Sequence, residues 1–177
     1  MRKTFVKILY TPKLENPILV AGFPGIGDVG VTVAKMLVEF SQATLFGSLF
    51  SPNFQDFVFI DKNGVCHPPK YEFYAAKRDR DLIILTGNGS PSPGDIYGHF
   101  EVCGAILDFV KKNGCRLIIA VDGTPASAFG DRIFVSGTSE DIISKCAEVG
   151  ATIYSNKIAI GLPGLLLGLA EKRGLEG

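Results

Sequence analysis

PILVAGFPGIGDVGVTVAKMLVEF at residues 17–40 is the stretch that decides the fold. It begins with an apolar run of strand length and ends with apolar residues at helical spacing, and a glycine-rich turn at 22–30 joins the two. A strand that leads directly into a helix is typical of α/β proteins. Such turns often hold ligands, so this turn is the first candidate for a site.

The glycine-rich turn has the spacing of a phosphate-binding loop but lacks its partners. Gly25, Gly27 and Gly30 fit G-x-G-x-x-G, yet LFSPNF at 49–54 offers no acidic residue for a ribose. The Walker spacing is also present, but Asp28 stands where lysine belongs. Its carboxylate would repel a phosphate, whereas it is suited to cap the helix. We therefore expect the glycines to allow a tight turn and close packing of helix on sheet.

Further apolar runs of strand length recur along the chain, each closed by a turn or a polar residue. They lie at 43–50, 57–61, 71–76, 81–87 and 116–123. Several are apolar on both faces, which is typical of parallel strands covered by helices on each side. Lys62-Asn63-Gly64 is a hairpin-turn signal and predicts an antiparallel excursion at that point.

Three stretches between these runs have helical periodicity, and each is expected to bury one apolar stripe. The first stripe consists of Val29, Val33, Met36, Leu37 and Phe40. The second consists of Ile96, Phe100, Cys103, Leu107 and Val110. The third helix, at 140–150, has Thr138 and Ser139 as candidate N-caps. The alternation predicts one α/β domain over 1–177, a three-layer sandwich with a mostly parallel sheet.

The composition excludes several classes of function. Eighteen basic and eighteen acidic residues leave no net charge and no basic run, which argues against nucleic-acid binding. The four cysteines form no C-x-x-C pair, and the N-terminus lacks a signal peptide, so we expect a cytoplasmic protein with free thiols. The longest uncharged stretch, 158–170, is shorter than the roughly 18 residues that a membrane span requires, so no membrane association is expected.

Recognisable catalytic groups are missing from the sequence. His67 and His99 have no second histidine or cysteine at metal-ligand spacing, and no G-x-S-x-G elbow is present. We therefore expect neither a metal nor a cofactor and favour a protein that is not an enzyme.

Loops that follow three of the predicted strands are the remaining candidates for a ligand site. In an open α/β sheet, ligands bind beyond the carboxyl ends of the strands, so these loops are expected to lie close together. The candidate residues are Phe23, Pro24, Gly25, Gly27, Asp28, Asn88, Asp95, Asp122 and Thr124. The same residue types also build ordinary turns, and that alternative is the stronger of the two.

The stretch GLPGLLLGLA at 161–170 predicts a helix that is apolar nearly all round. Such a helix is buried either in its own core or in a subunit contact. Leu162, Leu165, Leu166 and Leu169 are the candidates for such an interface. A chain ending in KRGLEG directly after a helix is unusual for an α/β domain, so we expect a shortened chain or a helix that packs on a partner.

Five motifs follow one another in an order that is more specific than any one of them. They are GFPGIGDVG (22–30), LFSPNF (49–54), YEFYAAKRDRDLIILTG (71–87), GAILDFVKKNGCRLIIAVDGTPAS (104–127) and GLPGLLLGLAEKRGLEG (161–177). In this order they resemble the archaeal branch of the proteasome-assembly-chaperone family. The resemblance implies an α/β sandwich similar to the nucleoside phosphorylase fold. It also implies homo-oligomers, whose eukaryotic relatives pair as chaperones that help to assemble the proteasome α-subunit ring.

Two further features of that family do not match this chain. Some members are labelled ATP-grasp proteins, but no basic nucleotide clamp and no carboxylate cluster for Mg²⁺ is present. Proteasome-binding members end in a hydrophobic residue, a tyrosine and one further residue, whereas this chain ends Leu175-Glu176-Gly177. Proteasome binding through such a tail is therefore not expected, and the family's usual chain continues beyond this point.

The resemblance and the missing catalytic groups together favour a non-enzymatic homo-oligomer that binds protein partners such as proteasome subunits. The alternative is a nucleotide- or nucleoside-binding protein, or an enzyme, with its site at the strand-end loops.

Overall fold

Residues 3–125, 130, 132–155 and 158–177 are described by the computed structural model of the protein. The fold is mixed α/β, with a sheet at its core and four α-helices in the described part of the chain. The sheet contains β1 (Phe5–Ile8), β2 (Ile18–Gly22), β3 (Thr44–Phe50), β6 (Tyr71–Ala76), β7 (Leu82–Gly87) and β8 (Leu117–Val121). The helices are α1 (Val29–Ser41), α2 (Ile96–Lys112), α4 (Glu140–Glu148) and α5 (Leu162–Glu171), and a 3₁₀ turn, η1 (Ile26–Asp28), precedes α1.

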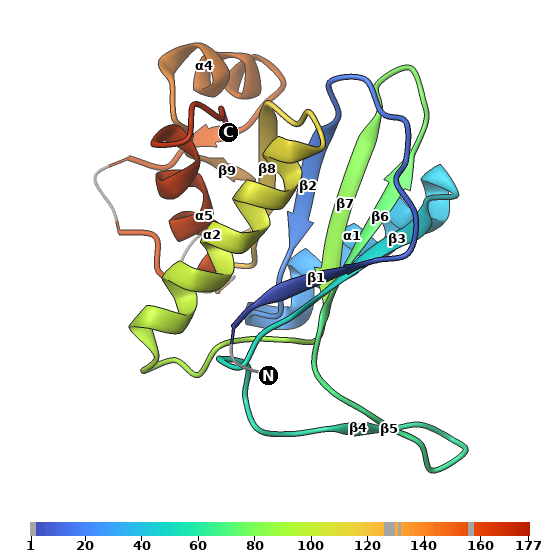
Figure 1. The fold of residues 1–177 in the computed structure, drawn as a ribbon. Helices are drawn as coiled ribbons and strands as arrows, with labels where there is room; N and C mark the ends of the chain where they lie inside the picture. Colours follow the sequence, from blue (N-terminus) through green and yellow to red (C-terminus); the bar gives the residue numbers. More distant parts are fainter. Residues whose placement is uncertain (1–2, 126–129, 131, 156–157) are drawn as a thin grey trace.

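The six strands lie in the order β1-β3-β6-β7-β2-β8 (Figure 1). β2 pairs in parallel with β7 and β8, whereas β1 with β3, β3 with β6 and β6 with β7 pair antiparallel. The prediction of a mostly parallel sheet is therefore wrong. The polar link 77–81 between β6 and β7 is too short for the crossover of a dozen or more residues that a parallel pair needs.

The antiparallel hairpin predicted at Lys62-Asn63-Gly64 is confirmed. β4 (Phe59–Ile60) pairs antiparallel with β5 (Cys66–His67), apart from the main sheet. The Asp61 carboxylate accepts hydrogen bonds from the backbone N–H groups of Asn63 and Val65, at 2.8 and 3.0 Å. These bonds favour the tight turn, and Gly64 adopts its positive φ of 79°.

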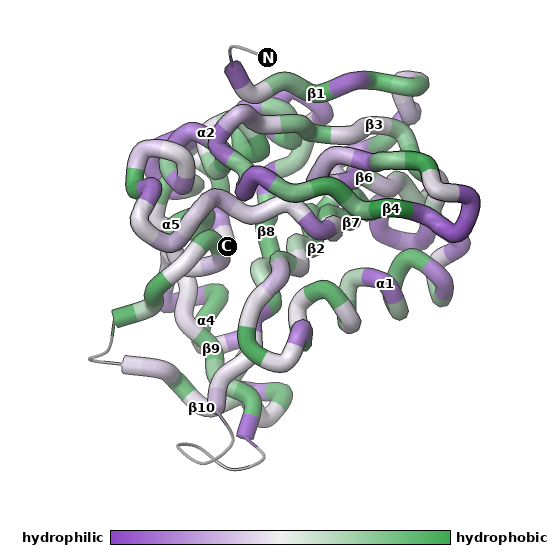
Figure 2. The backbone as a smooth tube through the Cα atoms, turned by 90° about the horizontal axis from the view of Figure 1, so that it is seen from below, coloured by the Kyte–Doolittle hydropathy of each residue, from purple (hydrophilic) through white to green (hydrophobic). Residues whose placement is uncertain are grey.

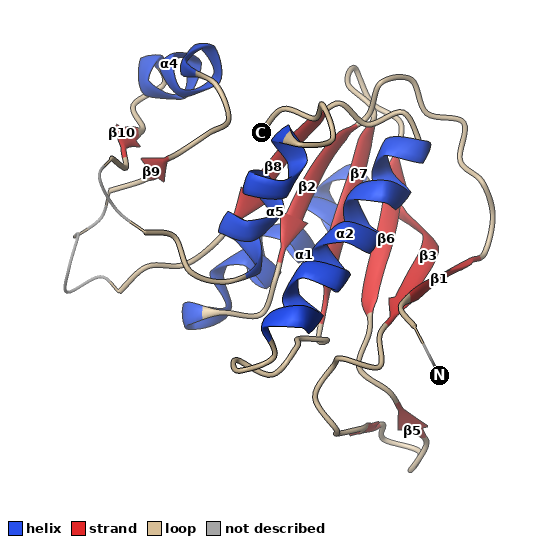
Figure 3. Ribbon diagram, turned by 60° about the vertical axis from the view of Figure 1, so that its left-hand side comes forward, coloured by secondary structure: helices blue, strands red, loops and turns tan. Residues whose placement is uncertain are grey.

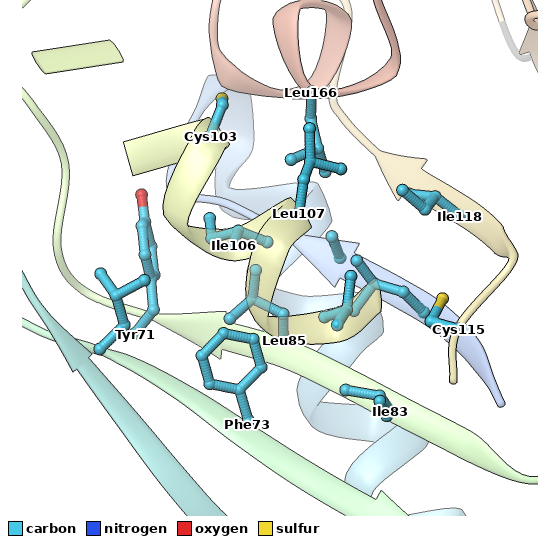
Figure 4. Packing of buried hydrophobic residues seen from close by; sticks show 14 of the residues in the cluster. Tyr71, Phe73, Ile83, Leu85, Cys103, Ile106, Leu107, Cys115, Ile118 and Leu166 are labelled. Carbon is cyan, nitrogen blue, oxygen red and sulfur yellow. The ribbon is translucent and has the colours of Figure 1, made fainter. Parts of the chain in front are cut away.

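One face of the sheet is covered by α2 and α5 (Figure 3). The core lies between this face and the two helices, and Figure 4 shows part of it. From the sheet it includes Leu19, Ala21, Phe46, Tyr71, Phe73, Ile83, Leu85 and Ile118. From the helices it includes Val102, Cys103, Ile106, Leu107, Val110, Leu162, Leu166 and Ala170. Hydrophobic burial on this face is the main stabilising contribution to the fold.

The opposite face is covered by α1, which lies unusually close to β2 (Figure 3). A Cβ atom added to Gly22 would lie 2.0 Å from the carbonyl oxygen of Gly30, and one added to Gly30 would lie 2.5 Å from that of Val121. The helix approaches this closely because neither glycine has a side chain. The expected close packing of helix on sheet is therefore confirmed at Gly30.

The apolar stripe predicted for α1 points away from the sheet, so the expectation that it is buried was wrong. Its exposed fractions are 41% for Val29, 39% for Val33, 64% for Met36 and 86% for Phe40, and only Leu37 is half-buried. The helix packs through small side chains instead. Its buried residues are Gly30, Ala34 and Ser41. Close approach, and not side-chain size, decided which face of α1 is buried.

The stripe predicted for α2 is buried only in its C-terminal half. Cys103, Leu107 and Val110 belong to the core, whereas Ile96 and Phe100 are exposed. The first turns of α2 project past the strands that the rest of the helix covers (Figure 1). Helical periodicity therefore identified the helix correctly but not the length over which it is covered.

The last part of the described chain forms a smaller unit beside β8. β9 (Phe134–Val135) and β10 (Thr152–Ile153) pair in parallel, with α4 between them in sequence. The Ser139 hydroxyl accepts a hydrogen bond from the N–H of Ile142, which confirms Ser139 as the N-cap of α4. Within the described residues, no helix combines the length and the apolar character needed to cross a membrane.

Candidate functional site

The glycine turn and the loop after β8 lie against each other at the carboxyl ends of the parallel strands. A Cβ atom added to Gly25 would lie 3.0 Å from Oδ1 of Asp122, and one added to Gly123 would lie 2.1 Å from the carbonyl oxygen of Ile26. The first and third of the three candidate loops are therefore neighbours, as predicted. They meet backbone to backbone, which explains why glycine stands at both positions.

The glycine turn itself is built by backbone conformation. Gly27 and Asp28 both have positive φ, at 62° and 51°. Asp28 occupies the N-cap position of α1, but its carboxylate makes no capping hydrogen bond, so its predicted role as a cap is wrong. Its own left-handed conformation is not the extended one from which N-cap side chains reach the helix.

Phe23 and Pro24 differ from the other residues of this turn. Phe23 is buried, and its ring lies edge-on to that of Tyr71, with 5.3 Å between the ring centroids. Pro24 is half-buried beside it. Phe23 is thus part of the core and is not available to a ligand, while Gly25, Gly27 and Asp28 are exposed.

Asn88 and Asp95, from the second loop, each support the backbone. The side-chain oxygen of Asn88 accepts a hydrogen bond from the N–H of Lys70 at 3.0 Å. Asp95 caps α2 by accepting a bond from the N–H of Gly98 at 2.9 Å. In the third loop Thr124 is exposed, and positions 126–127 lie outside the described residues. Turn chemistry, the alternative weighed for these residues, therefore accounts for Asp95, whereas the oxygen of Asn88 supports the backbone of a residue 18 positions away.

Asn88 also lines a cavity of about 320 Å³ on the α1 side of the sheet. Lys35, Val38 and Glu39 of α1 form one wall. Lys70 and, from β6, Glu72 and Tyr74 form a second wall, and Thr86 and Gly87 of β7 complete it with Asn88. The structure thus places Asn88, one of the candidate residues, at a cavity.

A short polar network occupies the sheet side of this cavity. The Lys70 ammonium lies 2.6 Å from Oε1 of Glu72, and the Tyr74 hydroxyl donates to Oε2 of the same carboxylate at 2.9 Å. Burial, and then the Glu72 charge, raises the pKa of Tyr74 to about 12. The phenol is therefore protonated at neutral pH and acts as a donor, so that Glu72 is satisfied at both oxygens.

The polar residues form a row across three strands. Ser48 pairs with Glu72, and Glu72 pairs with Thr86, so the three side chains point to the same face of the sheet. Ser48 and Thr86 are buried. The hydroxyl oxygen of Thr86 is buried without a hydrogen-bond partner in the described part of the chain.

Sequence analysis missed this polar row. In KYEFY at 70–74, polar and apolar residues alternate, which is the pattern of a strand with one polar face. The run 71–76 was predicted only as a strand, and no polar face was assigned to it. The alternation Lys70, Glu72, Tyr74 is the signal that identifies this side of the sheet.

The leucines proposed as an interface lie mainly inside the molecule. Leu162 and Leu166 are buried in the core, and Leu165 and Leu169 are half-buried and pack against it. The first of the two alternatives for this helix, its own core, therefore accounts for Leu162 and Leu166. The larger exposed apolar surface is the stripe on α1. Figure 2 shows that hydrophobic residues recur along this helix.

No metal site emerges from the described residues, and the two buried cysteines are poorly suited as nucleophiles. Burial raises the pKa of the Cys103 thiol to about 12 and also raises that of Cys115, so neither is a reactive thiolate at neutral pH. Across the described ranges, no three His, Cys, Asp or Glu side chains come together as a metal-binding group.

Comparison with known proteins identifies relatives over most of the chain. The model of the PAC2 family matches residues 19–177. Two uncharacterized proteins of Methanocaldococcus jannaschii are 28% and 26% identical over 93% of this chain. The chain spans 64% and 65% of their lengths.

Two solved structures from Pyrococcus furiosus are similar over essentially the whole chain. PbaB, an archaeal proteasome activator, is 36% identical with a TM-score of 0.88, and the match covers all of this chain and 78% of PbaB. PbaA, an archaeal homolog of proteasome-assembly chaperone, is 25% identical with a TM-score of 0.79, over 99% of this chain and 70% of PbaA. These matches lend no support to the ATP-grasp label.

Proposed function

The chain belongs to the PAC2 family, and on this premise we propose that it is a non-enzymatic, homo-oligomeric protein of the cytoplasm that binds other proteins, proteasome subunits among them. Similarity to an archaeal proteasome activator and to a homolog of proteasome-assembly chaperone supports a chaperone-like function. A chaperone of this kind works by contact, so it needs an exposed surface that another protein can cover.

The observation that carries the proposal is the exposed apolar stripe of α1, formed by Val29, Val33, Met36 and Phe40. The four residues recur at steps of four, three and four, which places them in one line along the helix. Contiguous apolar surface of this kind marks interaction sites on soluble proteins. Full burial of an exposed side chain of this size is worth about 1.5–3 kcal/mol, and Phe40, which is 86% exposed, comes nearest to that case.

The stripe also has the composition of an adaptable contact surface. Met36 is flexible and polarizable, and Phe40 is almost fully exposed at the end of the line. Lys35 and Glu39 lie beside it and supply a charged border. The interface is therefore assigned to α1, with Leu165 and Leu169 of α5 as secondary candidates.

Light scattering tests this proposal most directly. We expect the purified protein to be an oligomer and to form a larger species when proteasome α-subunits are added. Met36→Asp and Phe40→Asp should each dissociate one or both of these complexes, because a carboxylate in an apolar contact is costly to desolvate. Ser144→Asp, which adds the same charge on the exposed side of α4, is the control. A monomer that ignores α-subunits would contradict the proposal.

The alternative, a nucleotide- or nucleoside-binding site at the strand-end loops, is favoured by one observation. Asn88, at the end of β7, lines the cavity on the α1 side of the sheet. Likeness of a three-layer arrangement to the nucleoside phosphorylase fold would agree with this alternative, but fold likeness alone is weak support for function. Saturable binding of a nucleoside, lost in Asn88→Ala, would favour it over the chaperone proposal.

A further inference from the structure

The cavity between α1 and the strands β6 and β7 contains more polar groups than structural support requires. On the other face of the same strands, Phe73 and Leu85 face α2 in a dry core. Here Glu72, Tyr74 and Thr86 face α1. Burying polar groups beneath a helix costs stability unless each group is hydrogen-bonded. A cavity of this volume with a few convergent polar groups is typical of small-molecule sites.

The groups that have no protein partner are mainly donors. Both oxygens of Glu72 are satisfied, and the oxygen of Asn88 is held by the N–H of Lys70. The hydroxyl of Thr86 is buried without a partner in the described chain, and the hydrogen bond that the Asn88 side chain makes uses its oxygen and not its amide nitrogen. Lys70 retains two further N–H donors. The unsatisfied groups at this end of the cavity are therefore suited to bind a ligand that is rich in hydrogen-bond acceptors.

Charge on the α1 wall refines the type of ligand. Lys35 makes no ion pair within the described residues, and its side chain adds a second ammonium group to the lining. Glu39 adds a carboxylate on the same wall, where it disfavours a ligand with several negative charges. The volume of about 320 Å³ is at the lower end for ligand sites and limits the ligand to a small metabolite.

We propose that this cavity binds the oxyanion group of a small molecule, a carboxylate or a phosphate, through Lys70, Thr86 and Asn88, with Lys35 as the second cation. The hydroxyl of Thr86 donates to the oxyanion, which supplies the partner that the protein does not. The site lies beneath α1, whereas the apolar stripe of the proposed protein-binding function lies on the outside of the same helix, and Lys35 and Glu39 border both.

The test uses L-malate and inorganic phosphate as probes at constant ionic strength. Binding is followed by NMR chemical-shift titration of the whole chain. We expect saturable shifts, in the millimolar range, at Lys70 and at residues 86–88 for one or both probes. The probe that binds identifies the oxyanion as carboxylate or phosphate. Saturable shifts for neither probe would overturn the proposal.

Two matched variants separate a built site from adventitious binding. Thr86→Val removes the unpartnered hydroxyl without changing the shape of the side chain, and should weaken binding about tenfold or more, as expected for a hydrogen bond to a charged group. Tyr71→Phe removes the other buried hydroxyl that has no partner, on the opposite face of the sheet, and should leave the affinity unchanged. Equal affinities in both variants and the wild type would show an adventitious ion only.

The melting temperature of the protein without ligand measures independently how much each unsatisfied hydroxyl costs in stability. Thr86→Val and Tyr71→Phe should both melt at or above the wild-type temperature, because each replaces an unsatisfied polar group with an apolar one. Lys35→Gln should weaken binding about twofold to fivefold, as expected for an exposed charge. Lys145→Gln is the control. Lys145 lies on α4, where it pairs with Asp141, and does not line the cavity, so this change should not weaken ligand binding.

Discussion

The face of the sheet under α2 and α5 and the face under α1 differ in what they bury. Under α2 and α5 the strands present large apolar side chains such as Phe73 and Leu85. The helices contribute Leu107 and Leu166 to the same core. Under α1 the strands present the polar residues Glu72 and Thr86 beside the buried apolar residues Val20 and Ile84, and the helix packs through small residues. The same strands therefore contribute to the hydrophobic core on one face and line a polar cavity on the other.

The difference shows that a helix can pack closely on a sheet while its own large apolar side chains point away from it. α1 gains close contact at the glycines of β2 and of its own first turn, and its larger apolar side chains stay outside. Side chains that do not contribute to the core are free to contribute to binding. An exposed stripe on such a helix is thus a stronger indication of an interaction surface than a few scattered apolar residues would be.

Phe73→Ala is expected to have the largest effect on the free energy of unfolding. It tests the apolar face of the sheet under α2 and α5. Phe73 is fully buried, and its ring centroid lies 4.5 Å from that of Phe109. Loss of this side chain should lower the free energy of unfolding by about 3–5 kcal/mol through lost burial and the cavity left behind. Chemical denaturation followed by circular dichroism measures the change.

Phe40→Ala on α1 is the matched control for that experiment. Its side chain is exposed, so the free energy of unfolding of the isolated subunit should change by no more than about 0.5 kcal/mol. A loss as large as that at Phe73, measured under conditions where the protein is monomeric, would remove the contrast between the two faces.

Gly30→Ala is expected to have the next largest effect and tests the close approach of α1. The added Cβ would lie 2.5 Å from the carbonyl oxygen of Val121, so the helix must shift. We expect a loss of about 1–3 kcal/mol in the free energy of unfolding, as for other overpacked sites. The melting temperature in a calorimeter reports the loss.

Gly168→Ala provides the opposite result from the same chemical change. Gly168 lies within α5, and an added Cβ would meet no atom within 4 Å. Alanine should therefore stabilise the helix by up to about 1 kcal/mol. If both substitutions stabilise the protein, the packing of α1 does not depend on the absence of a side chain at residue 30.

Sequence patterns predict the order of the helices and strands better than they predict how each one is packed and paired. The strand, turn and helix at 17–40 were predictable because an apolar run, glycines and a helical period follow one another within a short stretch. Strand direction was not predictable from burial, because a strand covered on both faces is apolar whether its neighbours are parallel or antiparallel. The short link 77–81 carries that information, since its length excludes a crossover.

The candidate site was predictable only in part, and the reason is physical. Asn88 was among the predicted residues because polar side chains at the end of a strand are a general feature of ligand sites. Glu72 and Thr86 were missed because they become neighbours only through the β6–β7 register. The outward stripe of α1 was assigned to the core because large apolar residues usually are buried, although the close packing expected at Gly30 turns the opposite face of the helix, with Ala34, toward the sheet.

The smallest expected effect is the change in folding stability at alkaline pH. One tyrosine on each face of the sheet allows the two faces to be compared. Burial raises the pKa of Tyr74 on the α1 face to about 12 and raises that of Tyr71 on the core face well above its ordinary value. In the unfolded chain, tyrosine ionises near pH 10. Stability from these groups is therefore fully present below about pH 10 and is lost as the pH rises through the folded values.

Tyr71→Phe and Tyr74→Phe should each reduce the loss of stability between pH 8 and pH 11, measured by denaturant unfolding. The reduction should be larger for Tyr71, which is fully buried, than for Tyr74, whose partial exposure lets solvent screen the charge. Tyr97→Phe, an exposed position on α2, is the control and should have no such effect. Equal effects at Tyr71 and Tyr74 would mean that the α1 face desolvates its groups as strongly as the core, and that its polar row is as dry as the residues beneath α2.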